Sequence, residues 1–199
     1  MLERLRGLQT RMLGPLGARL TRRGVSPDAI TWLGGVGVTL AAILCFPAGR
    51  LWQGALAVAA LATLDMLDGH VARALPGRDH RYGAFLDASL DRVADAGVLG
   101  GLAWHLGLVR GAEWAAGAVV ALVAAQCTSY VKARAEAVGA TADVGVVTRA
   151  DRIALACAGA FLAGVGVPWA LETVVVVLTV GGVVSVVQRV VAVRHQLRR

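Results

Sequence analysis

Lysine, aromatic residues and paired cysteines are scarce in this chain of 199 residues. Lys132 is its only lysine, so arginine supplies almost all of the basic charge, and only 5% of the residues are aromatic. The three cysteines, Cys45, Cys127 and Cys157, stand inside apolar runs without the CxxC or Cys/His spacing of a metal site. This argues against a zinc site or a disulfide framework and indicates small buried side chains. The N-terminal segment also lacks the short apolar stretch and small-residue cleavage site of a secretory signal.

Charged residues make up only 17% of the chain, whereas hydrophobic residues make up 57%. Soluble domains have roughly 45–50% apolar residues, so the excess is typical of an integral membrane protein. The formal net charge is +7, and the basic residues cluster at the ends of the apolar runs. There they serve membrane topology and contact with anionic lipid headgroups, so we expect no nucleic-acid partner.

Six apolar segments are each about long enough to cross a hydrocarbon core of ~30 Å, which takes roughly 17–25 helical residues. They lie near 28–47, 52–74, 82–106, 112–136, 149–167 and 169–192. The strands of a β-barrel would be shorter and would alternate strictly in polarity. We therefore predict an all-α integral membrane protein with six transmembrane helices, which form one domain over residues 25–199.

The basic residues are distributed very unevenly over this six-span layout. Of the 20 Lys and Arg residues, all except Arg50 and Arg110 fall on one side. Under the positive-inside rule that side is cytoplasmic, which places both termini in the cytoplasm and the chain in the cell membrane. Leucines recur at helical spacing from Leu2 to Leu20, with arginines between them, so residues 1–24 are predicted to form an interfacial amphipathic helix.

Four aspartates interrupt the apolar pattern where the second span ends and the third begins. Asp65 and Asp68 lie at i and i+3, and Asp87 and Asp91 lie at i and i+4. One helical hairpin can therefore bring all four carboxylates together just inside the membrane. Such anions would not all stay ionised without cations between them. Carboxylate oxygens favour Mg²⁺ or Mn²⁺, and two ions roughly 4 Å apart suit in-line displacement at phosphorus, so we predict a two-metal site, with Mg²⁺ as the expected ion.

Two glycines and an arginine accompany the acids. Gly69 follows Asp68 directly, and Gly83 precedes Asp87 by four residues. Glycine at these places lets a phosphorylated ligand approach the backbone, although close helix packing is the alternative for either glycine alone. Arg73 either neutralises phosphate oxygens or caps the helix at the interface.

These residues together resemble the signature of the CDP-alcohol phosphotransferase family. The pattern is Asp65-x2-Asp68-Gly69-x2-Ala72-Arg73-x9-Gly83-x3-Asp87-x3-Asp91. The resemblance implies attack by an alcohol hydroxyl on the lipid-linked phosphate of a CDP-alcohol, with release of CMP at the cytoplasmic side, and it suggests a homodimer. It also implies that all four aspartates bind metal and that Asp91 acts as the general base.

The predicted nucleotide contacts come from the same signature and from a second, weaker match. The signature residues expected at the CDP-lipid are Asp68, Gly69, Ala72, Arg73 and Gly83. In "VSPDAIT", residues 25–31, the family resemblance places Pro27, Asp28 and Thr31 beside the nucleotide. Ser26-Pro27 is also a plain helix start, with serine as N-cap and proline in the first turn, and both interpretations can hold.

The acceptor alcohol is indicated by basic residues outside the signature. Lys132, Arg134, Arg152 and Arg189 lie at or inside helix ends at a shared depth, which predicts a pocket for a phosphate on the acceptor. Snorkelling to the interface is the alternative, mainly for the first three.

Three stretches, "DMLDG", "GAFLDASLDR" and "SYVKARAEA", together resemble the actinobacterial phosphatidylinositol-phosphate synthases. This resemblance implies CDP-diacylglycerol as donor and inositol 1-phosphate as acceptor. Glycerol 3-phosphate also carries a phosphate and is the alternative acceptor. A divalent-cation channel or transporter is the alternative from another class. Asp95, one turn after Asp91, either supports the site or pairs with Arg92.

Overall fold

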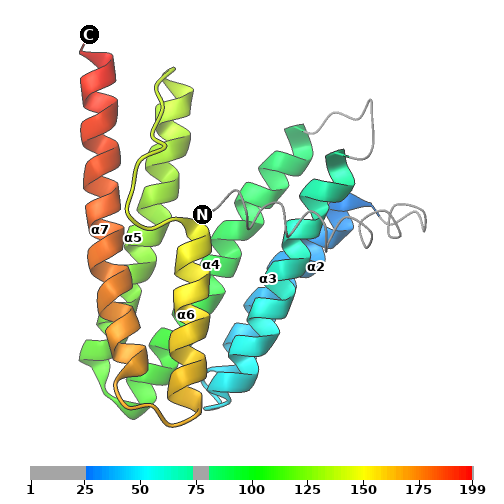
Figure 1. Cartoon of the computed structure of the whole chain (residues 1–199), viewed down its shortest axis with the longest axis vertical. Helices are drawn as coiled ribbons and strands as arrows, with labels where there is room; N and C mark the ends of the chain where they lie inside the picture. The colour runs from blue at the N-terminus through cyan, green and yellow to red at the C-terminus, as the bar shows by residue number, and fades with distance from the viewer. Residues whose placement is uncertain (1–25, 74–80, 199) are drawn as a thin grey trace.

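The computed structural model describes the backbone of residues 26–73 and 81–198, with their side chains except those of residues 27 and 64–73. Within these ranges the chain forms six helices (Figure 1): α2 Pro27–Cys45, α3 Leu51–Arg73, α4 Arg81–Val109, α5 Ala112–Ala137, α6 Arg149–Gly164 and α7 Ala170–Leu197. The prediction of an all-α chain is confirmed for the described residues, and each predicted segment overlaps one helix along nearly its whole length. The interfacial helix predicted for residues 1–24 lies outside the described residues.

Among the described helices, three are long and apolar enough to cross a membrane by length and composition. They are α2 over Asp28–Cys45, α5 and α7, and α3 adds a shorter apolar stretch over Leu51–Thr63. Helix α4 carries its charged residues from Arg81 to Asp95, in its first half. Helix α6 has 16 residues, which span only about 24 Å at 1.5 Å per residue. These apolar helices are those of a membrane protein.

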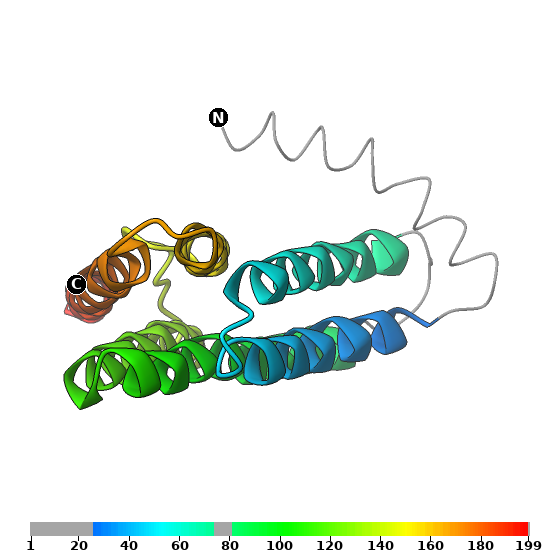
Figure 2. The same ribbon diagram turned by 90° about the horizontal axis from the view of Figure 1, so that it is seen from below.

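The six helices form two layers of three (Figure 2). Helices α2, α4 and α5 lie in one layer, where α4 packs between its two neighbours, and α3, α6 and α7 lie in the other, where α6 packs between its two. Contacts between α2 and α3, α4 and α6, and α5 and α7 join the layers. Successive helices run in opposite directions, so the α2–α3, α4–α5 and α6–α7 connections share one end of the bundle, at the bottom of Figure 1.

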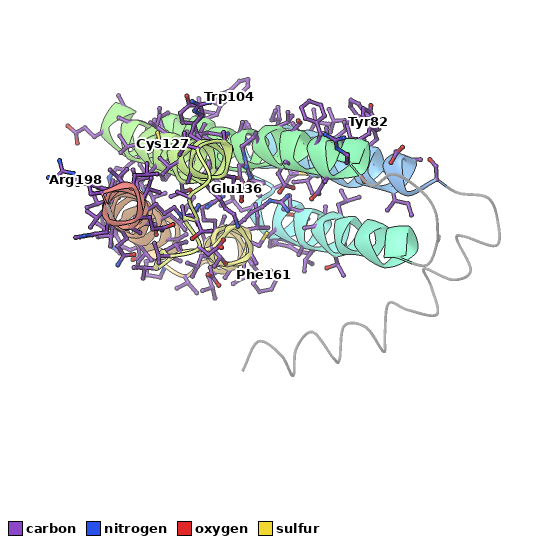
Figure 3. The ribbon with its side chains drawn as sticks, turned by 90° about the horizontal axis from the view of Figure 1, so that it is seen from above. Tyr82, Trp104, Cys127, Glu136, Phe161 and Arg198 are labelled. Atoms are coloured by element: carbon purple, nitrogen blue, oxygen red, sulfur yellow. The ribbon has the colours of Figure 1, made fainter. Side chains whose placement is uncertain are left out.

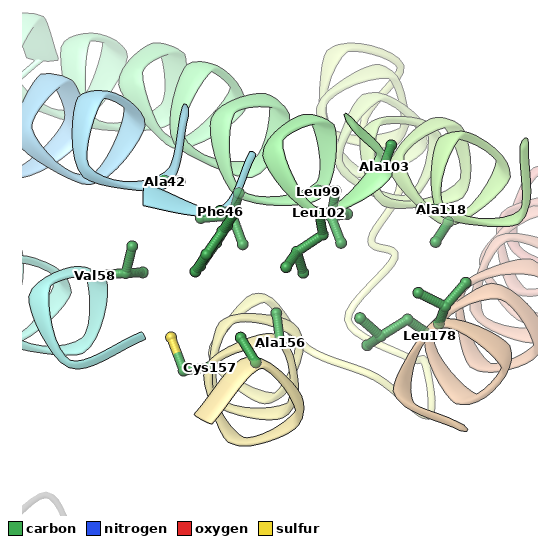
Figure 4. Close-up of a cluster of buried hydrophobic side chains, with 14 of the residues drawn as sticks. Ala42, Phe46, Val58, Leu99, Leu102, Ala103, Ala118, Ala156, Cys157 and Leu178 are labelled. Carbon is green, nitrogen blue, oxygen red and sulfur yellow. The ribbon is translucent and has the colours of Figure 1, made fainter. Parts of the chain in front are cut away.

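An apolar cluster fills the space between the layers (Figure 4). Phe46 at the end of α2 and Leu102 on α4 are fully buried and face Val58 of α3 and Leu178 of α7 across it. Because these side chains come from four helices of both layers, they fix the relative placement of the layers.

Glycines allow α4 to approach α2 closely. A Cβ added to Gly97 would lie 2.8 Å from the Cα of Thr39, and one added to Gly101 would lie 2.9 Å from the carbonyl oxygen of Ala42. No side chain fits at such distances, so the two backbones touch along this seam. Large apolar side chains lie on the outside instead: Trp104 and Phe161 project from opposite layers, as expected of a lipid-facing surface (Figure 3).

Candidate active site

Helix α2 begins where Ser26-Pro27 predicts. Ser26 Oγ accepts the backbone N–H of Ala29 at 3.2 Å, and proline stands in the first turn, where its missing N–H costs nothing. Asp28 in this turn lies beside the start of α4, because a Cβ added to Gly83 would be 3.7 Å from Asp28 Oδ1. Asp28 and Gly83, both predicted at the nucleotide, therefore meet, and Thr31 is buried one turn further along α2.

The four aspartates lie on two antiparallel helices (Figure 1). Helix α3 runs unbroken through Asp65 and Asp68, and Asp87 and Asp91 are one turn apart on α4. The side chains of Asp65, Asp68, Ala72 and Arg73, and the surroundings of Gly69, lie outside the described residues, so the four-carboxylate site stays a prediction. The described side chains contain no group of three or more His, Cys, Asp or Glu that could hold a metal. Asp87 and Asp91 offer carboxylate oxygens, the ligand type that suits a hard divalent cation.

Two arginines accompany the carboxylate of Asp91. Arg149 Nη2 lies 2.7 Å from Asp91 Oδ1, and Arg92 Nη2 lies 3.7 Å from Oδ2. Arg149 is the first residue of α6, so its ion pair joins α4 to α6. The Asp91 side chain is 14% exposed, which leaves the pair only partly screened by water. The predicted base thus has a close cationic partner, Arg149, which from the sequence alone is only one of the charges that set the membrane topology.

A second ion pair lies one turn further into the bundle. Arg152 Nη2 is 2.8 Å from Asp95 Oδ2, and the two side chains are 6% and 1% exposed. Arg92 and Arg149 approach Asp95 at 3.8 and 4.0 Å. The sequence left open whether Asp95 supports the site or pairs with Arg92. In the structure Arg92 lies near Asp95, but the close partner of Asp95 is Arg152. Leaving one member of such a buried pair alone costs about 3–5 kcal/mol, so each keeps the other in place.

Thr128 on α5 connects the two arginines predicted to hold the acceptor phosphate. Its hydroxyl accepts Arg152 Nη1 at 3.4 Å, and its carbonyl oxygen accepts Arg189 Nη1 at 2.6 Å. Arg189 Nε also donates to the carbonyl oxygen of Val144 at 2.9 Å. Helices α5, α6 and α7 thus meet at two guanidinium groups. Thr128 carries no signal in the sequence, because a hydroxyl side chain in an apolar helix usually bonds only to the backbone of its own helix, as Ser129 does with Ala125.

Lys132, one turn after Thr128, points to the link between α5 and α6. Its Nζ donates to Asp143 Oδ1 at 2.6 Å. This hydrogen bond and the charge of Lys132, with a smaller contribution from Arg189, hold the pKa of the Asp143 carboxyl below its ordinary value. Lys132, Asp143 and Arg189 therefore share one electrostatic environment. Arg134 is exposed on a different face of α5, and the described contacts do not join it to this cluster.

The first turn of α6 is held from both sides. A reciprocal capping box forms at its start, where Asp151 N–H donates to Thr148 Oγ1 at 3.3 Å and Thr148 N–H donates to Asp151 Oδ2 at 2.9 Å. Ser185 on α7 accepts the N–H groups of Val146 at 3.0 Å and Val147 at 3.2 Å, which tethers the preceding link. These contacts place the two arginines of α6 against α4.

Several known proteins are similar to this chain over most of its length. The phosphatidylinositol phosphate synthase of Cutibacterium acnes is 41% identical over 204 residues, which cover 98% of each chain. That of Mycobacteroides abscessus is 43% identical over 186 residues, 92% of this chain and 84% of the relative.

Solved structures of the Mycobacterium tuberculosis phosphatidylinositol phosphate synthase are also similar. The crystal structure with CDP-DAG bound has a TM-score of 0.86 and 36% identity, and covers 92% of this chain and 94% of that one. The structure of the same enzyme with manganese and citrate also has a TM-score of 0.86, over 92% of this chain and 88% of that one. Residues 24–183 match the family described as CDP-alcohol phosphatidyltransferase. The chain is a transferase and belongs to the CDP-alcohol phosphatidyltransferase family.

Proposed function

We propose that this chain transfers the phosphatidyl group of CDP-diacylglycerol to inositol 1-phosphate, giving phosphatidylinositol phosphate and CMP. One observation carries the proposal. Asp91, the predicted base, and Arg152 and Arg189, two predicted acceptor-phosphate residues, belong to one connected set of contacts across α4, α5, α6 and α7. The relatives reported above are named for this activity, which supports inositol 1-phosphate as the acceptor.

The donor lies against the starts of α2 and α4 and the end of α3. Asp28 and Gly83 meet there, and the absence of a side chain at Gly83 leaves room for the nucleotide. Asp65, Asp68, Asp87 and Asp91 would hold two Mg²⁺ ions, which would supply positive charge against the diphosphate and the departing CMP. The carboxylate oxygens of Asp87 and Asp91 are ligands that suit Mg²⁺, and Mn²⁺ has the same ligand preference.

The acceptor enters on the side of α5, α6 and α7. Arg152, Arg189 and Lys132 hold its phosphate with charge-assisted hydrogen bonds, and Arg134 adds positive charge nearby. Asp91 takes the proton of the attacking hydroxyl. The hydroxyl oxygen then bonds to the lipid-linked phosphorus while the bond from that phosphorus to the CMP oxygen breaks, so CMP leaves with the electron pair.

We infer that this chemistry takes place in the part of the bundle that lies away from three of its turns. The α2–α3, α4–α5 and α6–α7 connections share one end, which carries Arg50 and Arg110. Helix α5 and the C-terminus end at the other, and from there the α5–α6 link runs back along the bundle to α6 (Figure 1). This arrangement supports six membrane spans, with both termini and the site in the cytoplasm. A homodimer in the cell membrane, in contact with membrane lipids, is part of the same proposal.

An acceptor panel tests the function. Purified protein receives CDP-diacylglycerol and Mg²⁺ with inositol 1-phosphate, glycerol 3-phosphate, free inositol or serine, and CMP release is measured. We expect release with inositol 1-phosphate, loss of it in excess chelator, and recovery on adding Mg²⁺ or Mn²⁺. Faster release with glycerol 3-phosphate would reassign the enzyme to phosphatidylglycerol phosphate synthesis.

Asp91→Asn should abolish turnover and keep part of the CDP-lipid binding, because the base is lost while part of the predicted metal site remains. Full activity in this variant would refute the role of Asp91.

The alternative from another protein class is a divalent-cation channel or transporter. Measuring metal-dependent CMP release also tests this alternative, because a channel or transporter would release no CMP. Its path would need polar residues in both halves of the bilayer. The ion pairs of Asp91, Asp95, Arg149 and Arg152 lie on one half of α4 and α6, but Arg110 pairs with the buried Glu172 at the opposite end of the bundle. Metal-dependent CMP release, and not the distribution of charges, therefore decides between the two. Family membership also makes the chain a transferase.

A further inference from the structure

Helices α4 and α6 present two matched pairs of opposite charges to each other. Asp91 and Asp95 are one turn apart on α4, and Arg149 and Arg152 are one turn apart on α6. Arg149 contacts Asp91 at 2.7 Å and Arg152 contacts Asp95 at 2.8 Å. Arg149 Nε is also 4.0 Å from Asp95 Oδ1, so the two pairs are linked. The first turn of α6 therefore contacts both carboxylates of α4.

The two pairs differ in burial, which separates their roles. Asp95 and Arg152 are almost completely buried, whereas the side chains of Asp91 and Arg149 are 14% and 33% exposed. A buried pair locks the register of α6 against α4, because breaking it leaves a charge without water or partner. The Asp91–Arg149 pair is thereby held at a fixed depth in the bundle, on the side of the buried pair that substrates can reach.

We propose that Arg149 is a positioning residue for Asp91 and that it couples the general base to the acceptor site. This inference rests on the proposed function. The Arg149 guanidinium holds Oδ1 of Asp91, while Arg152, one turn along the same helix, contacts Thr128 and through it Arg189. Because both arginines belong to the capped first turn of α6, the base and the acceptor phosphate keep a fixed relative placement. Such fixed placement lowers the barrier to attack without tightening the binding of either substrate.

Turnover should respond to this role in a particular way. In Arg149→Gln, we expect kcat with inositol 1-phosphate to fall about 10- to 100-fold, because the Asp91 carboxylate is no longer held in the right direction for the attacking hydroxyl. The KM values for CDP-diacylglycerol and for the acceptor should stay within about threefold, since the groups that bind them are retained. A general loss of packing would instead raise both KM values together with the fall in kcat.

Metal affinity gives a readout that does not depend on turnover. Arg149 places a positive charge 2.7 Å from a predicted metal ligand. Removing that charge reduces electrostatic repulsion of a divalent ion, so Arg149→Gln should bind Mn²⁺ about three- to tenfold more tightly. Binding is measured from the electron paramagnetic resonance signal of free Mn²⁺ in detergent solution. Tighter metal binding together with slower turnover is a combination that structural damage does not produce.

Two further variants separate hydrogen bonding from charge. Arg92→Gln is the matched control, because Arg92 also places a charge near Asp91 but at 3.7 Å, outside hydrogen-bond distance. It should leave kcat within about twofold of the starting protein. Arg149→Lys keeps the charge and one donor, so its Mn²⁺ affinity should be unchanged and its kcat should lie between those of the starting protein and Arg149→Gln.

The outcomes distinguish this inference from the proposed function. If the unmodified protein releases no CMP with any acceptor of the panel, the proposed function fails. If it is active and Arg149→Gln keeps its kcat, or binds Mn²⁺ no more tightly, the positioning role of Arg149 is wrong. If Arg149→Gln does not fold in detergent, Arg149→Lys decides: an intermediate kcat with unchanged Mn²⁺ affinity supports the role, and an unchanged kcat refutes it.

Discussion

Asp95 is a single carboxylate on which two other functional side chains depend. It is 1% exposed and makes a 2.8 Å ion pair with Arg152, which in turn contacts Thr128. Neither charged group reaches water, so each is tolerated only because the other is present. This pairing holds the guanidinium of Arg152, which is predicted to bind the acceptor phosphate, in one direction before the substrate arrives.

Removing Asp95 alone should therefore destabilise the protein strongly. Asp95→Ala leaves Arg152 buried without its partner, at a cost of about 3–5 kcal/mol in the free energy of unfolding, measured by denaturation in mixed micelles. The double variant Asp95→Leu with Arg152→Met removes both charges and should recover most of this loss. A double variant no more stable than Asp95→Ala would show that the apolar contacts of the two side chains, and not the pairing of their charges, matter.

Arg189 should affect one substrate and not the other. It donates hydrogen bonds to the carbonyl oxygens of Thr128 and Val144, close to the Lys132–Asp143 pair and away from the residues of α2 that are predicted to contact the nucleotide. In Arg189→Gln, the KM for inositol 1-phosphate should rise at least about tenfold, as expected for the loss of a charge-assisted phosphate contact, while the KM for CDP-diacylglycerol changes little. Gln188→Ala, an exposed neighbour on α7, is the control. Equal effects of Arg189→Gln on both KM values would contradict the acceptor pocket.

At the scale of helices, hydropathy predicted the spans better than the helix ends. The last segment was expected to end at 192, but α7 continues to Leu197. Backbone hydrogen bonds continue past the apolar run, so Arg194 and His195 lie within the last helical turns and not in a tail. Conversely, α6 ends at Gly164 and not at 167, because the chain must turn before Trp169, which adopts a left-handed conformation with φ of 59°. Apolar content sets which residues can be in the membrane, and the turns set where helices stop.

The seam between α2 and α4 offers a test at this scale. Gly101 and Gly100 are adjacent on α4, but only Gly101 faces α2, where an added Cβ would meet the carbonyl oxygen of Ala42 at 2.9 Å; one added to Gly100 would meet nothing within 4 Å. Gly101→Ala should push the helices apart and lower the free energy of unfolding by about 1–3 kcal/mol. Gly100→Ala should be neutral or up to about 1 kcal/mol stabilising, because alanine favours a helix. Equal stability of the two variants would show that the seam is less tight than the distances indicate.

At the scale of the whole molecule, the sequence predicted which residues belong to the site better than it predicted the ion pairs that join them. The spacing of Asp87 and Asp91 within one helix is legible in the sequence, because 3.6 residues per turn place them on one face. The Arg149–Asp91 and Arg152–Asp95 pairs are not, since they depend on how α4 and α6 of different layers pack. The complementary spacing of two aspartates and two arginines was available, but nothing in the sequence selects α6 as the partner of α4. Only the two-layer packing does so.

The two-layer bundle also predicts which connections are reachable from each side of the membrane. Ala48, between α2 and α3, and Val138, directly after α5, are both exposed, and the ends of α2 and α5 that they follow lie at opposite ends of the bundle. In a variant whose Cys45, Cys127 and Cys157 are replaced by alanine, Ala48→Cys should react with a membrane-impermeant maleimide on intact cells. Val138→Cys should react only after permeabilisation, because the proposed topology places its end of the bundle, which carries most of the positive charge, in the cytoplasm. The reverse labelling pattern would show that the membrane topology is inverted and that the site lies at the outer face of the membrane. Labelling of both cysteines on intact cells would contradict a bundle whose turns lie at opposite ends of the membrane.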